Sequence, residues 1–246
     1  MRKLWVGTSG WNYGDWKGKF YPEGLSAREW LNFYAQRFST VEVNYSFYHL
    51  PRPSTYENWA KAVPDDFIFG LKASRVVTHI KRLRGVKEEL SKFLENSKVL
   101  GSKLGPLLFQ FPPSFRANPT LLKEFLKLKT TNQRWAFEFR HSSWFVKEIY
   151  KILETQNVAL VMADSPRHPL VKEITADFTY LRFHGAEEMF SSKYSKSELT
   201  AWAKEIRKWL RQLDVYAYFN NDIRAAAVEN SKMLAEILSN PMGAAL

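Results

Sequence analysis

The chain has 246 residues, 45% of them hydrophobic and 15% aromatic, which excludes a disordered chain and suits one large domain with a sizeable core. Its formal net charge of +11 favours anionic partners, although a solvated, lysine-coated surface would give the same charge. The absence of cysteine excludes disulfides, zinc–thiolate sites and thiol catalysis.

The N-terminus contains no apolar run of signal-peptide length, and no stretch approaches the roughly 18 apolar residues of a membrane span. We therefore expect a cytoplasmic protein without membrane partners. No composition break divides the chain, so residues 1–246 are predicted to form a single domain. These features do not predict the oligomeric state.

Short apolar runs recur along the chain, each followed by a polar or glycine-rich loop, and helical patterns lie between them. The runs predict strands at residues 3–8, 40–47, 66–73, 106–112, 134–140, 158–164, 178–185 and 214–221. Helices are predicted at 26–38, 85–101, 118–128, 195–213 and 222–239, the last with Asn221 or Asp222 as its cap. Eight alternating strands predict an α/β fold, a (β/α)8 TIM barrel, with a doubly wound open sheet as the alternative.

The loop after the first strand, VGTSGWNYGDWKGKFYP (6–22), combines flexible glycines with large aromatic residues. Its spacing fits neither the G-x-G-x-x-G fingerprint nor a P-loop, so a nucleotide site of either type is not favoured. It is not a G-x-S-x-G elbow either, which argues against Ser9 as a nucleophile. In a barrel, Trp11, Tyr13 and Trp16 would wall the pocket, cover it as a lid, or cap the core.

Polar residues concentrate at the C-terminal ends of the predicted strands, where the active sites of TIM barrels lie. Because side chains alternate across a strand, we expect one face of several strands to carry charge into the barrel interior. This predicts a pocket made by Ser9, Trp11, Glu42, Asn44, Lys72, Gln110, Glu138, Arg140, Asp164, Arg182, His184 and Asn220. The alternative is a self-satisfied ion-pair network that plugs the barrel.

Glu138 and Asp164 end adjacent strands and are the predicted acid–base pair. Arg140, Arg182 and Lys72 would hold a carboxylate or phosphate. His184 would assist proton transfer, unless it is a satisfied core imidazole. Glu42, Glu138, Asp164 and His184 also suit a divalent metal, but the arginines compete for the carboxylates, so we predict no cofactor.

The loop LKASRVVTHIKRLRG (71–85) is the best candidate for contacting an anion, unless it is an ordinary basic helix face. The segments 184–195 and 219–222 occupy the usual phosphate site of these barrels. The predicted partner is an anionic small molecule or a nucleic acid, for which Trp11, Tyr13 and Trp16 would supply stacking surfaces.

Several motifs resemble the YecE-like family, known as domain of unknown function 72. In order, these are GTSGWNYGDWKGKFYP, VEVNYSFYHLP, FGLKASRVVTH, LLFQFPP, FEFRHSSW, RFHG and YAYFNN. The resemblance covers essentially the whole chain and implies a TIM barrel, but it implies no reaction. The chain departs from the family at 223–225, where the family tends to a glycine, and at AEEMF (186–190), so an anion site at this corner is less expected.

Together these features predict an enzyme that acts on an anionic, phosphate-bearing substrate at the barrel mouth, with a hydrolase, lyase or isomerase reaction left open. The alternatives are a nucleic-acid-binding or metal-dependent nuclease-like barrel, and a non-catalytic ligand-binding protein.

Overall fold

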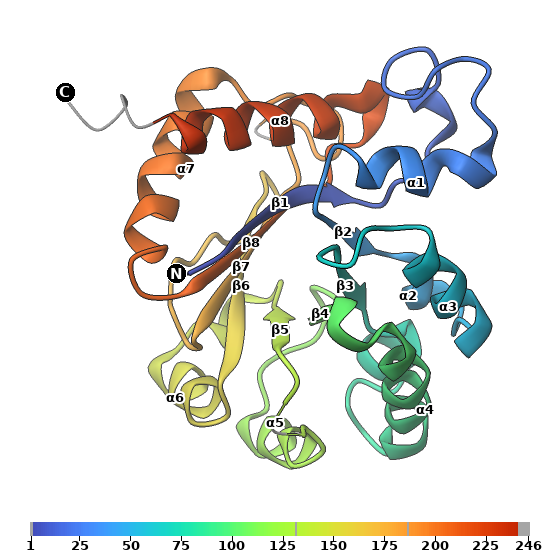
Figure 1. Cartoon of the computed structure of the whole chain (residues 1–246). Coiled ribbons are helices and arrows are strands. Elements are labelled where there is room, and N and C mark those ends of the chain that lie inside the picture. Colours follow the sequence, from blue (N-terminus) through green and yellow to red (C-terminus); the bar gives the residue numbers. More distant parts are fainter. Residues whose placement is uncertain (1, 131, 186, 241–246) are drawn as a thin grey trace.

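The computed structural model describes residues 2–130, 132–185 and 187–240, so the predicted domain end at residue 246 lies outside the described residues. Eight parallel strands close into a barrel in sequence order, surrounded by helices (Figure 1). The α/β TIM-barrel fold predicted from the sequence is confirmed. The strands are β1 (Leu4–Ser9), β2 (Thr40–Val43), β3 (Ile68–Lys72), β4 (Leu104–Gln110), β5 (Trp135–Glu138), β6 (Val158–Asp164), β7 (Phe178–Phe183) and β8 (Asp214–Phe219).

The helices are α1 (Trp30–Ala35), α2 (Tyr45–Tyr48), α3 (Pro53–Lys61), α4 (Lys87–Ser97), α5 (Pro119–Leu126), α6 (Lys147–Thr155), α7 (Lys196–Trp209) and α8 (Ala226–Ser239). Three of these helices, α2, α3 and α6, are not among the helices predicted from the sequence. Residues 45–47, predicted as strand, belong to α2. Shorter turns are η1 (Gly14–Trp16), η2 (Ala27–Glu29), a π-helical turn η3 (Val76–Ile80), η4 (Lys98–Lys103), η5 (Ser142–Trp144) and η6 (Ile223–Ala225).

Local capping explains where two of the main helices begin. Ser195 and Glu198 form a reciprocal capping box at the start of α7, which satisfies two backbone N–H groups. The Asn118 side chain accepts a hydrogen bond from the Leu121 N–H at 2.9 Å, and Pro119 occupies the first position of α5.

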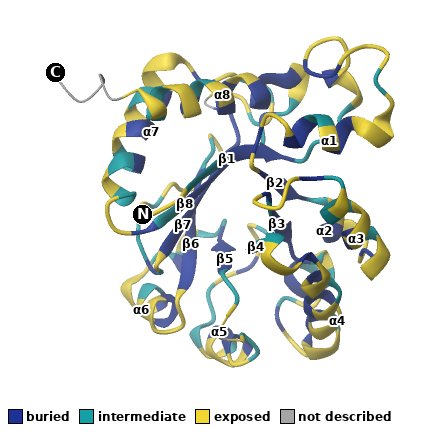
Figure 2. Ribbon diagram, in the orientation of Figure 1, coloured by how far each residue is buried: buried dark blue, intermediate teal, exposed yellow. Residues whose placement is uncertain are grey.

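Two apolar layers hold the barrel together. The outer layer lies between strands and helices, and Figure 2 shows helices with buried inner faces and exposed outer faces. The inner layer fills the barrel with Leu108, Ala136, Ala159, Val161, Phe178, Tyr180, Tyr216 and Tyr218. Above it the interior turns polar, since Tyr180 donates to Glu42 at 2.7 Å and Tyr218 contacts the Thr40 hydroxyl at 2.7 Å. This change of polarity sets the floor of the barrel mouth.

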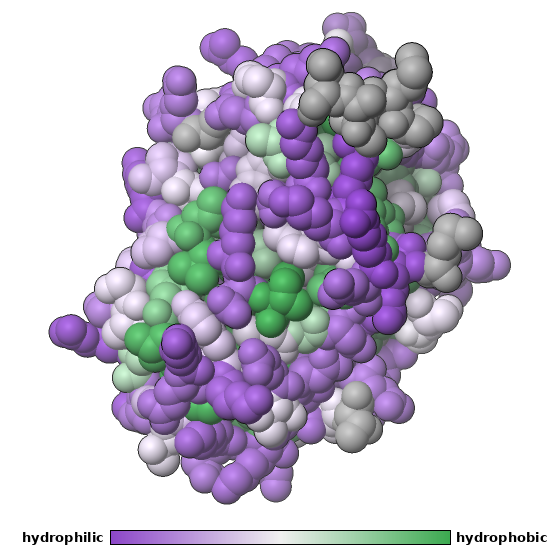
Figure 3. Space-filling model, turned by 90° about the vertical axis from the view of Figure 1, so that its left-hand side faces the viewer, coloured by the Kyte–Doolittle hydropathy of each residue, from purple (hydrophilic) through white to green (hydrophobic). Residues whose placement is uncertain are grey.

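Within the described ranges, no helix has the length and apolarity needed to cross a membrane. Figure 3 shows one side of the molecule, where hydrophobic patches are interrupted by hydrophilic side chains.

Gly7 lies where β1 approaches β2 closely, since an added Cβ would lie 2.3 Å from the Thr40 carbonyl oxygen. We expect Gly7→Ala to lower the free energy of unfolding by about 3 kcal/mol, because two backbones must separate. Gly14→Ala is the matched control, with no atom within 4 Å of its added Cβ. Urea unfolding followed by circular dichroism measures both, and equal midpoints would contradict the predicted clash.

Candidate functional site

A cavity of about 580 Å³ opens at the C-terminal ends of the strands. It is lined by Tyr13, Asn44, Phe47, Tyr48, Lys72, Arg75, His79, Gln110, Arg140, Arg182, Phe190, Asn220 and Asp222. The strand ends and following loops of every strand except β6 contribute to this lining. Six of these residues are predicted site residues, namely Asn44, Lys72, Gln110, Arg140, Arg182 and Asn220.

The floor of the cavity is an ion-pair network centred on Arg182. Its guanidinium binds Glu42 in bidentate fashion, with Nε–Oε2 2.9 Å and Nη2–Oε1 2.8 Å. The remaining terminal nitrogen, Nη1, donates to Glu138 Oε2 at 2.6 Å. All three side chains are buried, so this network replaces the water that the charges lose.

Neighbouring groups complete the network. The Ser9 hydroxyl donates to Glu42 Oε1, and Arg140 Nε donates to Glu138 Oε1 at 2.8 Å. Every oxygen of the two carboxylates therefore has a partner, and two arginines balance their two negative charges. The self-satisfied network considered from the sequence describes this floor but not the whole mouth.

Glu138 is an unsuitable proton donor. Burial alone would raise its pKa, but Arg182 and then Arg140 hold the pKa well below the usual range of a carboxyl. Glu138 is therefore ionised at neutral pH and serves to anchor the two arginines.

Asp164 does not face the cavity, which corrects its predicted pairing with Glu138. In β6, Ala159 and Val161 belong to the inner layer, so alternation directs Asp164 to the outside of the barrel. There its carboxylate accepts a hydrogen bond from Trp202 Nε1 of α7 at 2.8 Å. Burial raises the pKa of Asp164, but no reacting group of the mouth lies beside it.

His184 is buried beneath the cavity. Its Nδ1 lies 3.0 Å from the Asn220 side-chain nitrogen, which donates, and this leaves the ring proton on Nε2. Nε2 is 4.0 Å from Glu138 Oε1 and has no hydrogen-bond partner among the described residues. Burial, and then the charge of Arg182, hold its pKa well below the usual range, so His184 is a neutral donor rather than a proton shuttle.

Lys72 ends β3 and is only 9% exposed. Its Nζ lies 4.2 Å from the centroid of the Phe47 ring. Burial, and then the charge of Arg182, lower its pKa to about 7. About half of the molecules therefore carry a neutral amine here at pH 7, which makes Lys72 a weaker anion holder than predicted.

Asp222 is a site residue that the sequence did not single out, since it was expected only as a helix cap. Its side chain makes no cap hydrogen bond; instead Asp15 accepts from the Arg224 N–H at 2.8 Å. Asp222 Oδ2 lies 3.1 Å from the Tyr13 hydroxyl, which also lies 2.5 Å from the Ser9 carbonyl oxygen. Burial raises the pKa of Asp222 to about 8, so it holds a proton at neutral pH.

The corner after β8 is shaped differently from a phosphate site. Arg224 and Ala225 adopt φ of 55° and 63°, the left-handed region that glycine enters without steric cost. The carboxylates of Asp15 and Asp222 crowd the start of α8. Of the AEEMF stretch, Ala186 lies outside the described residues, and Phe190 is an exposed aromatic residue at the cavity rim.

The opening loop divides its aromatic residues between core and cavity. Trp16 is fully buried and donates from Nε1 to the Asp222 carbonyl oxygen at 2.9 Å. Trp11 packs edge-on against Trp59 at 5.4 Å and is not part of the lining. Only Tyr13 of the three faces the mouth, so the predicted row of stacking surfaces does not form.

The basic loop after β3 reaches the cavity through Arg75 and His79. Lys81 and Arg82 instead contact Glu89 and Ser114. His79 lies in the π-helical turn, a feature frequent at functional sites. Burial, and then the charge of Lys72, lower the pKa of His79 to about 4, so it is neutral.

The four candidate metal ligands do not converge. Asp164 points away, and the oxygens of Glu42 and Glu138 are held by arginines. Within the described ranges, no group of three histidine or acidic side chains is arranged to hold a metal ion.

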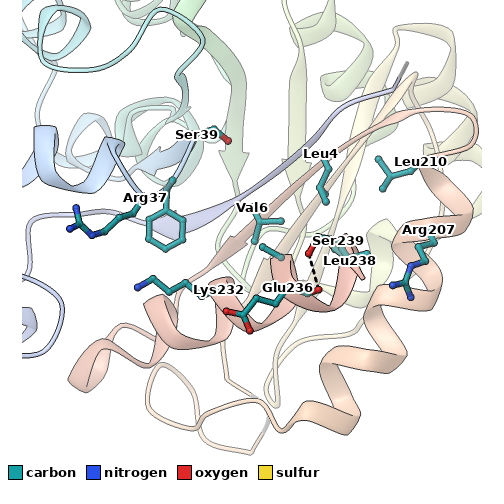
Figure 4. A pocket seen from close by; sticks show the side chains of 12 residues that line it. Leu4, Val6, Arg37, Ser39, Arg207, Leu210, Lys232, Glu236, Leu238 and Ser239 are labelled. Carbon is teal, nitrogen blue, oxygen red and sulfur yellow. Dashed lines mark hydrogen bonds between the residues drawn. The ribbon is translucent and has the colours of Figure 1, made fainter. Parts of the chain in front are cut away.

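A second cavity, of about 490 Å³, lies between β1, α7 and α8, lined in part by Leu4, Val6 and Arg207 (Figure 4). One of its charged groups is engaged within the protein, since Arg207 donates to the Ile237 and Asn240 carbonyl oxygens. This second cavity lies outside the barrel, and the barrel mouth is therefore the better candidate for a functional site.

A family model described as "Protein of unknown function DUF72" matches residues 5–245. The chain belongs to this family. It is 27% identical over 270 residues to UPF0759 protein YunF of Bacillus subtilis (strain 168), covering 96% of this chain and 94% of that protein. It is 24% identical to UPF0759 protein YecE of Escherichia coli (strain K12), over 92% of this chain and 89% of that protein.

Crystal structures of DUF72 proteins share this fold. The TM1631 protein of Thermotoga maritima MSB8 aligns with 29% identity and a TM-score of 0.88, covering 97% of this chain and 100% of that chain. The EF0366 protein of Enterococcus faecalis V583 aligns with 21% identity and a TM-score of 0.80, over 98% of this chain and 99% of that chain. The predicted family is confirmed, and the names of these relatives state no activity.

Arg182→Met would leave two carboxylates buried without their shared partner. We expect the free energy of unfolding at pH 7 to fall by about 3–5 kcal/mol, the cost of breaking a buried ion pair. Glu42→Gln combined with Arg182→Met should recover part of this loss. Lys92→Met, which breaks a solvent-exposed pair with Glu88, is the control and should change stability far less. An equal effect of Arg182→Met and Lys92→Met in urea unfolding would refute the account.

Asp222 should make stability fall as pH rises. Its pKa is raised to about 8 in the fold, so between about pH 4 and pH 8 the folded chain holds one more proton than the unfolded chain. Asp222→Asn should leave Tm unchanged near pH 4 and raise it by several degrees near pH 9. The exposed Asp65→Asn is the control. Scanning calorimetry at several pH values measures the Tm of both variants. If the difference in Tm between Asp222→Asn and the unaltered protein did not depend on pH, this would argue against a protonated Asp222.

Proposed function

We propose that this DUF72 protein is an enzyme that binds an anionic small molecule at the barrel mouth and moves protons within it. The observation that carries the proposal is the charge balance. Glu42 and Glu138 are neutralised by Arg182 and Arg140, so the cations left over are Lys72 and Arg75. Neither forms a salt bridge with any of the described residues, and both line the cavity.

Unpartnered polar atoms support a ligand at the same place. Asn44 Oδ1, His184 Nε2 and Asp222 Oδ1 are buried without a hydrogen-bond partner among the described residues. Leaving a buried polar group unpaired costs about 1–3 kcal/mol, so such groups commonly bind a ligand or a water molecule. Arg140 uses only Nε for Glu138, which leaves its terminal nitrogens to bind a carboxylate or phosphate.

Proton transfer would use Lys72 and Asp222. Their pKa values lie at about 7 and about 8, close to the pH at which a general base and a general acid work best. Lys72 ends β3 and Asp222 follows β8, so the two groups reach the cavity from strand positions separated around the barrel. This assignment replaces Glu138 and Asp164 as the acid–base pair.

A small molecule suits the site better than a nucleic acid does. A cavity of about 580 Å³ has the size of a small-ligand pocket. The exposed aromatic residues at its rim are Tyr48 and Phe190, whereas Trp16 is buried and cannot stack on a base. Nucleic-acid binding is therefore kept as a distinct outcome of the experiment below.

Thermal shift with inorganic phosphate, malonate and phosphoglycolate at pH 7 tests the proposal. At least one should raise Tm, and Arg75→Met should weaken its apparent affinity about tenfold by removing a charged hydrogen bond. The Arg75 side chain makes no salt bridge or hydrogen bond with the described residues that the substitution would remove, and exposed Arg211→Met is the matched control. The proposal would be contradicted if no anion raised Tm, or if an anion raised the Tm of Arg75→Met as much as that of the unaltered protein. Salt-dependent binding of an oligothymidylate in place of the small anions would favour the nucleic-acid alternative.

A further inference from the structure

Lys72 is a buried amine that has no ionic partner among the described residues, which is unusual inside a protein. The nearby carboxylates that would pair with it are fully occupied, Glu42 by Ser9, Tyr180 and Arg182, and Glu138 by the two arginines. The face of the Phe47 ring, 4.2 Å from Nζ, is the contact that the amine makes instead. Lys72 thus faces the cavity as a single nitrogen that nothing in the described chain neutralises.

Burial, and then the charge of Arg182, destabilise the ammonium ion of Lys72 and lower its pKa to about 7. The charges of Arg182 and Arg140 oppose a further positive charge, and burial removes the water that would stabilise it. Desolvation and neighbouring cations are the two means by which proteins activate a lysine as a nucleophile. A lysine that only held an anion would instead keep its charge.

We infer that Lys72 attacks the carbonyl carbon of an anionic aldehyde or ketone substrate and forms an imine with it. This inference rests on the proposed function, because Arg75 and Arg140 are the groups that would hold the anionic end of the substrate. The site residues supply the remaining requirements of the reaction, which are a proton donor and hydrogen bonds to the substrate.

The step balances without an oxidant or reductant. The Nζ lone pair forms a C–N bond, the carbonyl π electrons move to oxygen, and that oxygen takes a proton while nitrogen loses one. The resulting hydroxyl then accepts a proton from an acid and leaves as water while the nitrogen lone pair closes the C=N bond. Asp222 is protonated at neutral pH and lines the same cavity, so it is the acid. The side-chain carbonyl of Asn44, which lines the cavity, has no hydrogen-bond partner among the described residues and is free to bind another polar group of the substrate.

Reductive trapping tests the inference. The full chain is incubated near pH 7.5 with pyruvate, glyoxylate or dihydroxyacetone phosphate, each alone, and then reduced with sodium cyanoborohydride. Intact-protein and peptide mass spectrometry locates the resulting secondary amine. An exposed lysine is only about 0.1% neutral at this pH, so at least one carbonyl probe should label Lys72 at least about tenfold more than the average exposed lysine.

The variants separate a specific imine from general lysine chemistry. Lys72→Arg should abolish the excess label, Arg75→Met should raise the probe concentration needed for half labelling, and Lys98→Arg, at an exposed position, should change neither. If Lys72→Arg does not fold, the distribution of label among the lysines of the unaltered protein decides alone. Label spread evenly over the lysines overturns the inference.

The anion thermal shift is measured on the same preparation, so the two ideas fail separately. A shift with phosphate, malonate or phosphoglycolate but no excess label on Lys72 overturns the imine and keeps anion binding. Absence of both shift and label overturns both.

Discussion

The arrangement of this barrel mouth depends on one buried guanidinium. Arg182 is 1% exposed, and it binds side chains from β2 and β5 as well as the Ser9 hydroxyl from β1. Burying a single charge costs several kcal/mol, and the geometry offsets that cost only because every nitrogen of the fork has an acceptor. The guanidinium is planar with fixed donor directions, so it also fixes where Glu42 and Glu138 stand.

The chemistry of the mouth follows from this arrangement. Arg182 and Arg140 pair with both carboxylates, so Lys72 has no counterion among the described residues. Burial, and then the charge of Arg182, lower its pKa. The same network supports Asn44 through the Ser9 hydroxyl, which accepts from the Asn44 side chain at 2.7 Å and leaves Asn44 Oδ1 unpartnered. A structural ion-pair network and the proposed ligand site are therefore compatible, because the network leaves Lys72 and Asn44 Oδ1 without partners among the described residues.

The sequence predicts the barrel and most of the floor, because alternation along a strand decides which side chains enter the interior. It places Glu42, Glu138, Arg182 and His184 correctly, since their strands alternate between polar and apolar residues. It misplaces Asp164 because β6, VALVMAD, is apolar on both faces and shows no polar face that would reveal which residues point inward. Asp222 lies beyond the end of β8. There the path of the loop, rather than the alternation of side chains along a strand, decides which way a side chain points.

The two sides of the mouth differ in charge, and this difference orients a ligand. Lys72, Arg75 and Arg140 lie on the side of β3 to β5, whereas Asp15 and Asp222 lie beside the start of α8. An anionic group placed at the usual phosphate corner would meet two carboxyl groups and a helix start whose N–H of Arg224 is already taken by Asp15. The same group placed near Arg140 finds terminal guanidinium nitrogens that the network does not use. In the proposed reaction, the anionic end of the substrate would lie toward Arg140, and its carbonyl carbon would lie beside Lys72 with its oxygen toward the proton of Asp222.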